Sequence, residues 1–371
     1  MSADCGITII GAGIVGLAIA SAVSEEEGSV YILEKDRTHG TGISSRNSEV
    51  VHAGIYYPPG SMKSRFCIEG KEQIYEICER QNIPYMRTGK LIIARTEAER
   101  ATLEKLKENA ERSGVASLSV LDEEQLRTME PNVRAIGGLF SPDTGIVNAH
   151  LLMDYFLRNA KQHGADIACG TTVKGIEAVY GGYRITTTDA AGERFEFVSE
   201  RVVNAAGLYA DEIAGMLGGR YSHYYCKGDY FSVNNVRKGT VQRLIYPVPE
   251  ANHVGLGVHV TLDLSGRMRL GPDAVYIEKK EEYRVDAAKR DAFYESAVTF
   301  LPFIQRENIV PEMSGIRPKL QGPGEGFRDF VISEDHPGFI NLVGIESPGL
   351  TAAPAIARYV RTLVANARAA A

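Results

Sequence analysis

The chain opens with a hydrophobic pattern that is typical of a βαβ unit. Residues 6–10 form a short run of mostly β-branched apolar side chains, and residues 17–24 combine small and apolar side chains as a packed helix does. A second apolar run, SVYILE, follows and ends at Glu34. This order predicts a buried parallel strand, a helix that packs on it and a second parallel strand.

Farther along the chain the pattern changes to alternation with a period of two. Residues 171–211 alternate short β-branched segments with glycine-rich turns, then end in a buried strand and a turn of small residues. The segments GDYFSV, RLIYPVP, HVGLGVHVTLD and RMRLGPDA also alternate and carry aromatic residues, which predicts a separate antiparallel sheet. Residues 338–363 predict a strand, a glycine-rich turn and an alanine-rich helix, and residues 95–115 predict a charged amphipathic helix.

Composition and charge are those of an ordinary globular protein. The 371 residues are 44% hydrophobic and 24% charged, with a net charge of −6 and no basic stripe, so nucleic-acid binding has no electrostatic support. No apolar run reaches the roughly 18 residues that span a bilayer. Because a strand-like run follows the first five residues at once, we expect no signal or transit peptide. Five cysteines without a CxxC pair argue against a disulfide scaffold or a metal site; we expect reduced thiols in a cytoplasmic protein.

The turn after the first strand reads GAGIVG and has the features of a dinucleotide-binding loop. Gly11 permits a tight turn, Gly13 lets backbone amides approach a pyrophosphate, and Gly16 lets the helix pack close to the strand. Glu34, 23 residues after Gly11, is placed to accept hydrogen bonds from a ribose and would repel a phosphorylated one. The motif by itself does not separate NAD from FAD, and a βα turn without a ligand is the alternative.

The segment after Glu34 is polar and rich in glycine and hydroxyl groups. A simple NAD dehydrogenase continues with another crossover helix and strand, whereas this chain continues KDRTHGTGISSRNSEVVHAGIYYPPG. The hydroxyls of Ser44, Ser45 and Ser48 and the amide of Asn47 suit a backbone that lies against a large planar cofactor and its phosphates.

Several blocks along nearly the whole chain resemble the flavoenzymes of the D-amino-acid oxidase and glycerol-3-phosphate dehydrogenase superfamily. Within it, the chain is most similar to the L-2-hydroxyglutarate dehydrogenase/oxidase group. Besides the first βαβ unit, the blocks are SSRNSEVVHAGIYYPPGSMKSRFCIEG, GKLIIA, SPDTGIVNAHLL, VVNAAGLYAD, CKGDYF, LIYPVP, GLGVHVTLDLSGRMRLGPDA, SGIRPKL and NLVGIESPGLTAAPAIA. Because they occur in order, they are more specific together than any one of them alone.

The resemblance implies a cofactor, a reaction and a domain organisation. It implies noncovalent FAD, and oxidation of L-2-hydroxyglutarate or a close 2-hydroxy acid to the 2-oxo acid by hydride transfer to flavin. Glycerol-3-phosphate oxidation, amino-acid oxidation and a noncatalytic flavin-binding module are the alternatives; oxygen or a quinone could be the electron acceptor. We expect an α/β fold, with a Rossmann-like FAD-binding domain (residues 1–85, 143–222 and 325–371) and an interleaved α+β substrate domain built on an antiparallel sheet (residues 86–142 and 223–324).

The expected cofactor residues come from six separate places in the chain. The turn at residues 204–207 can approach the diphosphate and ribose, and Val173 matches a backbone position that faces adenine in the family. The glycine-rich turn at residues 344–351 would bring amides and a positive helix end to the flavin pyrimidine ring. Glu346 in that turn should point away or pair with a cation. The full set is Gly11, Gly13, Ile14, Val15, Gly16, Glu34, Lys35, Thr41, Ser44, Ser45, Arg46, Asn47, Ser48, Val173, Ala206, Gly207, Gly344, Ser347, Gly349, Leu350 and Thr351.

The expected catalytic residues are two histidines and an arginine. Oxidation of a 2-hydroxy acid needs a base for the hydroxyl proton, and His52 and His259 are candidates because a neutral imidazole is available near pH 7. Arg317 can grip a carboxylate through two parallel hydrogen bonds; a surface ion pair is the alternative. The alternatives for His52 are covalent attachment to the flavin and a purely structural hydrogen bond. The expected substrate contacts are Tyr57, Lys227, Tyr246, Thr261 and Arg317, with Lys319 available for a second carboxylate.

Overall fold

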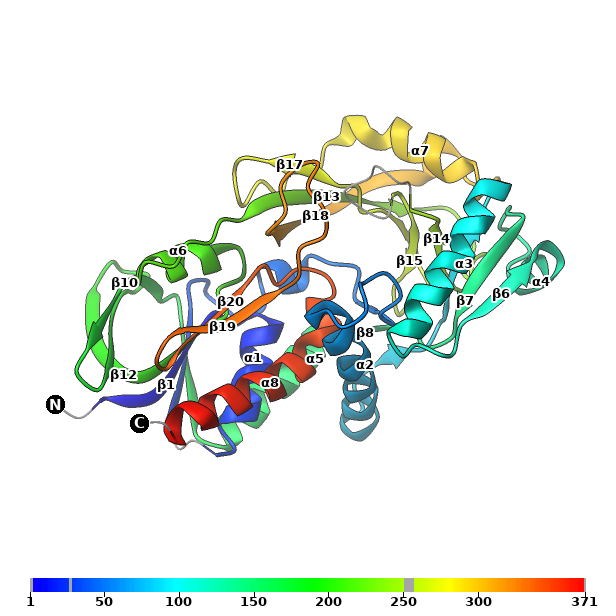
Figure 1. Cartoon of the computed structure of the whole chain (residues 1–371). Coiled ribbons are helices and arrows are strands. Elements are labelled where there is room, and N and C mark those ends of the chain that lie inside the picture. Colours follow the sequence, from blue (N-terminus) through cyan, green and yellow to red (C-terminus); the bar gives the residue numbers. More distant parts are fainter. Residues whose placement is uncertain (1–2, 27–28, 250–256, 370–371) are drawn as a thin grey trace.

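The computed structural model describes residues 3–26, 29–249 and 257–369, and two large sheets organise them (Figure 1). The first sheet contains the βαβ unit that the sequence predicts. Strand β1 (Cys5–Ile10) lies parallel to β2 (Val30–Glu34), and helix α1 (Ile14–Val23) connects them. The prediction of a Rossmann-like start is therefore confirmed.

The first sheet has eight strands, and its centre is parallel. Its order is β10 (Thr172–Val179), β11 (Gly182–Thr188), β12 (Arg194–Asn204), β1, β2 and β9 (Ala165–Cys169), and β20 (Phe339–Val343) joins it beside β12 and pairs with β19 (Val331–His336). The strands β12, β1, β2 and β9 run parallel, as does β20 against β12, whereas β10–β11–β12 and β19–β20 are antiparallel. The helices provide the cover that a parallel sheet requires.

Helices from both ends of the chain pack together against this sheet. Helix α1 contacts α5 (Ala149–Gln162) and α8 (Gly349–Ala369), and α8 also contacts α2 (Met62–Gln81) (Figure 1). Their apolar faces form one core with β1, in which Ile7 and Ile9 are fully buried. Gly16 permits the close approach of α1, because a Cβ atom there would lie 2.0 Å from the Gly11 carbonyl oxygen.

The second sheet has nine strands and a core of its own. Its order is β17 (Val275–Ile277), β13 (Tyr224–Val233), β16 (Met268–Leu270), β15 (Val260–Leu262), β14 (Leu244–Pro247), β5 (Lys90–Ala94), β7 (Gly137–Ser141) and β6 (Ser119–Asp122), with β18 (Ile309–Lys319) beside β13. Helices α3 (Glu97–Arg112), α4 (Glu123–Met129) and α7 (Arg290–Val298) belong to the same part of the chain. The expected antiparallel pairing holds except between β14 and β5, which are parallel.

Two smaller features complete the fold. A three-stranded sheet, β3 (Val50–Val51), β8 (Gly145–Val147) and β4 (Tyr85–Met86), lies where the chain passes between the large sheets, and α6 (Ala210–Gly215) follows β12. Every strand of the eight-stranded sheet falls within residues 1–85, 143–222 and 325–371, and every strand of the nine-stranded sheet within residues 86–142 and 223–324. We propose these two sets of segments as the two domains.

The structure adds two findings about cysteines and helices. All five cysteines are unpaired. Of the helices in the described residues, none is both long enough and apolar enough to cross a membrane.

Candidate active site

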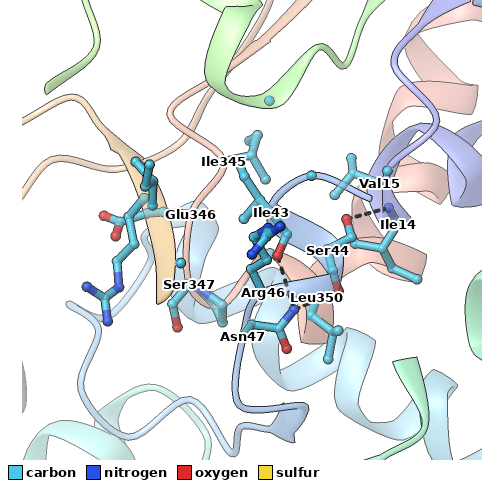
Figure 2. Close-up of a pocket in the computed structure, with 18 of the residues that line it drawn as sticks. Ile14, Val15, Ile43, Ser44, Arg46, Asn47, Ile345, Glu346, Ser347 and Leu350 are labelled. Carbon is cyan, nitrogen blue, oxygen red and sulfur yellow. Dashed lines mark hydrogen bonds between the residues drawn. The ribbon is translucent and has the colours of Figure 1, made fainter. Parts of the chain in front are cut away.

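A cavity of about 1050 Å³ extends from the glycine-rich turn into the region between the two sheets. Figure 2 shows that three separate segments meet at its wall: the start of α1 with Ile14, residues 43–47, and residues 345–350. Glu34 and Lys35 line one part of the cavity, and strands β13, β14 and β18 contribute Tyr230, Tyr246 and Arg317 to another. The chain therefore builds this site from residues that are far apart in sequence.

The glycine-rich turn leaves its backbone open to the cavity. Gly11 has a φ of +104°, and a Cβ atom there would lie 2.5 Å from the Ala205 carbonyl oxygen. Gly13 precedes α1 and has no side chain to cap it, and the Ile14 N–H instead donates to Ser44 Oγ at 2.9 Å (Figure 2). The helix start and the serine loop are thus joined, with the positive end of α1 at the cavity.

Glu34 is held by the backbone around it. Its carboxylate accepts from the Ala12 N–H at 2.8 Å and from the Asp36 N–H at 2.9 Å. A carboxylate has about four acceptor positions, so two remain for the hydroxyls of a ribose. The position and the chemistry both agree with the role that the sequence predicts for this residue.

The loop after β2 folds around Asn47. The Asn47 side-chain amide, labelled in Figure 2, donates to the carbonyl of Ser44 at 2.8 Å. Its oxygen accepts from the Glu49 N–H at 2.8 Å. Asn47 therefore shapes its own loop, which includes the short 3-10 helix Ile43–Ser45. Nearby, the guanidinium of Arg46 lies 4.1 Å from the centre of the Tyr283 ring, so a residue of the second sheet's segment closes over the loop.

The turn before α8 is tied to the His52 segment and to two lysines. Thr351 Oγ1 accepts from the His52 backbone N–H at 3.0 Å. Glu346 lies within 2.9 Å of Lys63 Nζ and 3.3 Å of Lys319 Nζ. Burial alone would raise the pKa of the Glu346 carboxyl, but these two lysines hold it below its usual value. The expectation that Glu346 pairs with a cation is confirmed.

His259 is oriented by two contacts. Its Nδ1 lies 2.9 Å from the Gly257 carbonyl oxygen, and its ring stacks on Tyr246 with centroids 3.9 Å apart. Because a carbonyl can only accept, Nδ1 carries the proton in the neutral ring, and Nε2 keeps its lone pair. Burial lowers the pKa of His259 to about 3, with smaller contributions from the positive charges of Arg317 and Lys90.

His52 has the same electrostatic character. Burial lowers the pKa of His52 to about 3, and Lys90 and His259 lower it further. Both imidazoles are therefore neutral at neutral pH, the form that a general base requires.

Arg317 lies in the cavity wall and not on the outer surface. Its Nη1 is 3.5 Å from the Asp273 carbonyl oxygen and 3.9 Å from Cys226 Sγ. Within the residues that the structure describes, Arg317 forms no ion pair with a carboxylate. The alternative of a surface ion pair is wrong for this part of the chain, and the guanidinium has donors left for an anionic ligand.

Most of the predicted site residues line this one cavity. The structure places there Gly11, Gly13, Ile14, Val15, Gly16, Glu34, Lys35, Thr41, Ser44, Arg46, Asn47, Ser48, His52, Tyr57, Ala206, Gly207, Tyr246, His259, Arg317, Ser347, Gly349, Leu350 and Thr351. Lys319 lines it as well, two residues from Arg317 on β18.

Five predicted residues do not reach the cavity wall. Ser45 donates to the Thr41 carbonyl, and the Gly344 N–H donates to His223 at 3.1 Å. Val173 packs in the apolar cluster of Ile10 and Leu33. Lys227 and Thr261 are the other two, and their positions follow from the strands that carry them.

Strand alternation turns Lys227 away. Gly228 and Tyr230 of β13 face the cavity, so Lys227 and Asp229 face the opposite side. There Lys227 donates to the Arg284 carbonyl and lies 3.5 Å from Asp229. Thr261 is buried within β15, and its hydroxyl has no hydrogen-bond partner within the described residues. The prediction that these two side chains contact substrate is not supported by their placement.

Sequence reasoning missed four residues near the site. Lys63 and Tyr56 lie within a family-like block, but nothing in the block separates an inward side chain from an outward one. Tyr283 comes from an irregular segment without a motif. Lys90 does not line the cavity itself, but its Nζ lies 4.7 Å from the ring centre of Tyr56, which does. Only strand alternation in GKLIIA could have indicated that Lys90 shares a face with Ile92.

The fold and the cavity are those of a dinucleotide-binding protein with a site between its two large sheets. Comparison with known proteins names the family. The family model "FAD dependent oxidoreductase" (DAO) matches residues 6–363. The chain belongs to this family.

Individual relatives agree with that assignment. The chain is 37% identical to the mitochondrial L-2-hydroxyglutarate dehydrogenase of Arabidopsis thaliana, over 95% of this chain and 82% of the relative. It is 31% identical to a glycerol 3-phosphate dehydrogenase of Caloramator mitchellensis, over 97% and 74%. Its fold is similar to the FAD-bound L-α-glycerophosphate oxidase of Mycoplasma pneumoniae, with a TM-score of 0.88, 27% identity and coverage of 97% and 94%.

The protein is an FAD-dependent oxidoreductase, and its cavity suits FAD. A volume of about 1050 Å³ is at the upper end for a ligand pocket, as so large a cofactor requires. Backbone amides without side chains lie at the Gly11–Gly13 turn, and the carboxylate of Glu34 retains acceptor positions for a ribose. These residues would hold the cofactor at its nucleotide end.

Proposed function

We propose that this FAD-dependent oxidoreductase oxidises L-2-hydroxyglutarate, or a close 2-hydroxy acid, to the corresponding 2-oxo acid. The observation that carries the proposal is a neutral imidazole, His259, in the same cavity as an arginine without a carboxylate partner among the described residues, Arg317. A 2-hydroxy acid needs both groups, one for its hydroxyl proton and one for its carboxylate.

The protein's own residues would bind and orient such a substrate. Arg317 donates two parallel hydrogen bonds to the 1-carboxylate and so fixes the α-carbon. Nε2 of His259 accepts the proton of the 2-hydroxyl group, while the Nδ1–H bond to Gly257 holds the ring in the required tautomer. Tyr246, stacked on His259, limits the movement of that ring. Bound FAD supplies the two-electron oxidant for the α-carbon.

The charge of the cavity favours a second anionic group on the substrate. Lys63 and Lys319 share the single carboxylate of Glu346, which leaves one positive charge in excess beside Arg317. Arg317 and Lys319 are two residues apart on β18, so their Cα atoms are separated by about 6.6 Å. Both residues line the cavity, so each carboxylate of a five-carbon dicarboxylate has a cation available. Relatives in Arabidopsis, Indibacter alkaliphilus and Escherichia coli are named L-2-hydroxyglutarate dehydrogenases.

Glycerol 3-phosphate is the second candidate, since a relative and a structural neighbour are named for it. Anaerobic reduction of the flavin in the purified holoenzyme distinguishes the two candidate substrates. We expect the second-order rate constant for flavin reduction by L-2-hydroxyglutarate to be at least roughly tenfold above that for L-lactate, because lactate lacks the second carboxylate. Bleaching by glycerol 3-phosphate or amino acids but by no 2-hydroxy acid would overturn the proposal.

We also propose that FAD is bound without a covalent bond to His52. The glycine turn, the loop at residues 43–47 and the turn before α8 offer backbone groups along the cofactor cavity. Denaturing the holoenzyme and passing it through a size-exclusion filter should release all the flavin into the filtrate. Flavin that stays on the peptide containing His52 would show that the proposal is wrong.

A further inference from the structure

Lys90 differs from the other buried lysines of this protein. Five lysines are buried in the described part of the chain: Lys63, Lys71, Lys90, Lys227 and Lys319. Lys63 and Lys319 pair with Glu346, Lys71 pairs with Glu72 and Asp143, and Lys227 pairs with Asp229. Lys90 is 1% exposed and forms no carboxylate ion pair within those residues. An unpaired buried charge is unfavourable, so stability does not account for it.

The Lys90 ammonium group lies against two aromatic rings that line the cavity. Its Nζ is 4.7 Å from the ring centre of Tyr56 and 4.9 Å from that of Tyr246. Strand β5 lies parallel to β14, with Lys90 beside Leu244 and Ile92 beside Tyr246, so Lys90 and Tyr246 share one face of the sheet. Aromatic faces attract a cation, and the attraction increases when water is excluded.

The titratable groups around Lys90 come from every element packed against it. They are Tyr246 on β14, His52 and Tyr56 in the segment after β3, Cys67 on α2, and His259 before β15. Burial raises the pKa of Tyr56 and Tyr246 and raises that of Cys67 to about 12, so none of them is an anion at neutral pH. The charge of Lys90 therefore acts on the two imidazoles without being neutralised by an acid.

We propose that Lys90 is a positioning residue for the catalytic base: its ammonium group holds the Tyr246 ring against His259, and its charge acts on the imidazoles of His52 and His259. A nearby positive charge disfavours a second positive charge on an imidazole. Burial lowers the pKa of Lys90 to about 7, so the cation predominates below that pH and adds to the effect of burial on the two imidazoles. The identity of the base in this inference rests on the proposed function. The effect of the Lys90 charge on the two imidazoles does not depend on it.

The test compares Lys90→Met with Lys90→Arg. Removing the charge raises the pKa of His259 and His52, so the acid limb of flavin reduction moves to higher pH. Both imidazoles have a pKa of about 3, and losing the charge should raise it by about one unit, so the two profiles separate near pH 4. There Lys90→Met should keep about half of its rate at pH 8, whereas the wild type keeps about nine tenths. Lys90→Arg keeps a cation that stacks on aromatic rings and should retain the wild-type profile. Identical profiles for wild type and Lys90→Met would overturn the proposal.

Lys71→Met is the matched control, because Lys71 is a buried lysine whose charge is neutralised by Glu72 and Asp143. It should lower the thermal midpoint without moving the pH profile. If Lys90→Met does not fold, Lys90→Gln replaces it and tests the same charge removal. A shift in Lys71→Met equal to that in Lys90→Met would show that the effect is structural.

A second readout needs no turnover. The imidazole resonances of the holoenzyme, labelled in histidine and assigned with His52→Asn and His259→Asn, report each pKa directly. An upward shift of about one pKa unit in Lys90→Met supports the proposal, and an unchanged titration overturns it. If no 2-hydroxy acid reduces the flavin, the proposed function fails, yet this titration still decides the role of Lys90.

Discussion

Replacing Arg317 with methionine is expected to lower kcat/KM for L-2-hydroxyglutarate by about 100- to 1,000-fold, or roughly 3–4 kcal/mol. Methionine has a similar reach but cannot donate to a carboxylate. Because Arg317 has no carboxylate partner among the described residues, its removal leaves no protein acid unpaired. The loss would therefore report on substrate binding. Steady-state kinetics with the purified holoenzyme measure it.

Two further variants separate charge from geometry at this position. Arg317→Lys keeps the positive charge and loses the planar fork, so an intermediate loss is expected. Arg306→Met serves as the control, since Arg306 is an exposed arginine paired with Asp291 outside the cavity. An unchanged apparent affinity in Arg317→Met, with FAD still bound, would remove Arg317 from the substrate site.

Replacing His259 with asparagine is expected to lower the rate of flavin reduction by roughly 10²- to 10⁴-fold, the usual contribution of a general base. The hydrogen bond from Nδ1 to the Gly257 carbonyl leaves Nε2 as the acceptor, which assigns the proton to this atom. Anaerobic stopped-flow reduction at a saturating substrate concentration measures the effect. The loss should appear in the limiting rate more than in the apparent affinity.

His163 provides a control with the same local geometry. Its Nδ1 lies 2.8 Å from the Asn159 carbonyl oxygen, but the residue lies on the exposed end of α5. The flavin of His163→Asn should be reduced by substrate at the wild-type rate. His52→Asn should have a smaller effect than His259→Asn; the reverse order would transfer the base to His52, and full activity in both variants would contradict a histidine base.

The sequence predicted the residues whose roles depend on the backbone. Gly11, Gly13, Gly16 and Glu34 occur at fixed distances along one βαβ unit, and that unit forms locally. Ser44 was also expected at the site, and the structure shows that its hydroxyl caps α1. The resemblance along the chain correctly indicated the family and FAD.

The sequence could not predict how long-range packing would use polar side chains. Asn47, which was expected to contact the cofactor, lines the cavity, and its amide also makes three hydrogen bonds within its own loop. Lys227 and Lys90 lie on strands of the same sheet. The face of the sheet on which each side chain lies determines which of the two is near the cavity. That face depends on how β5, β13 and β14 are arranged, because side chains alternate along every strand.

The sequence by itself therefore determined the fold class, the cofactor family and the nucleotide-binding turn, since these depend on local spacing and on the order of blocks. The tertiary structure decided which charges are paired. It placed Glu346 between Lys63 and Lys319 and left Arg317 without a carboxylate partner among the described residues. It also placed Lys90 beneath two aromatic rings. Such pairings join segments up to hundreds of residues apart, and only the folded chain brings those segments together.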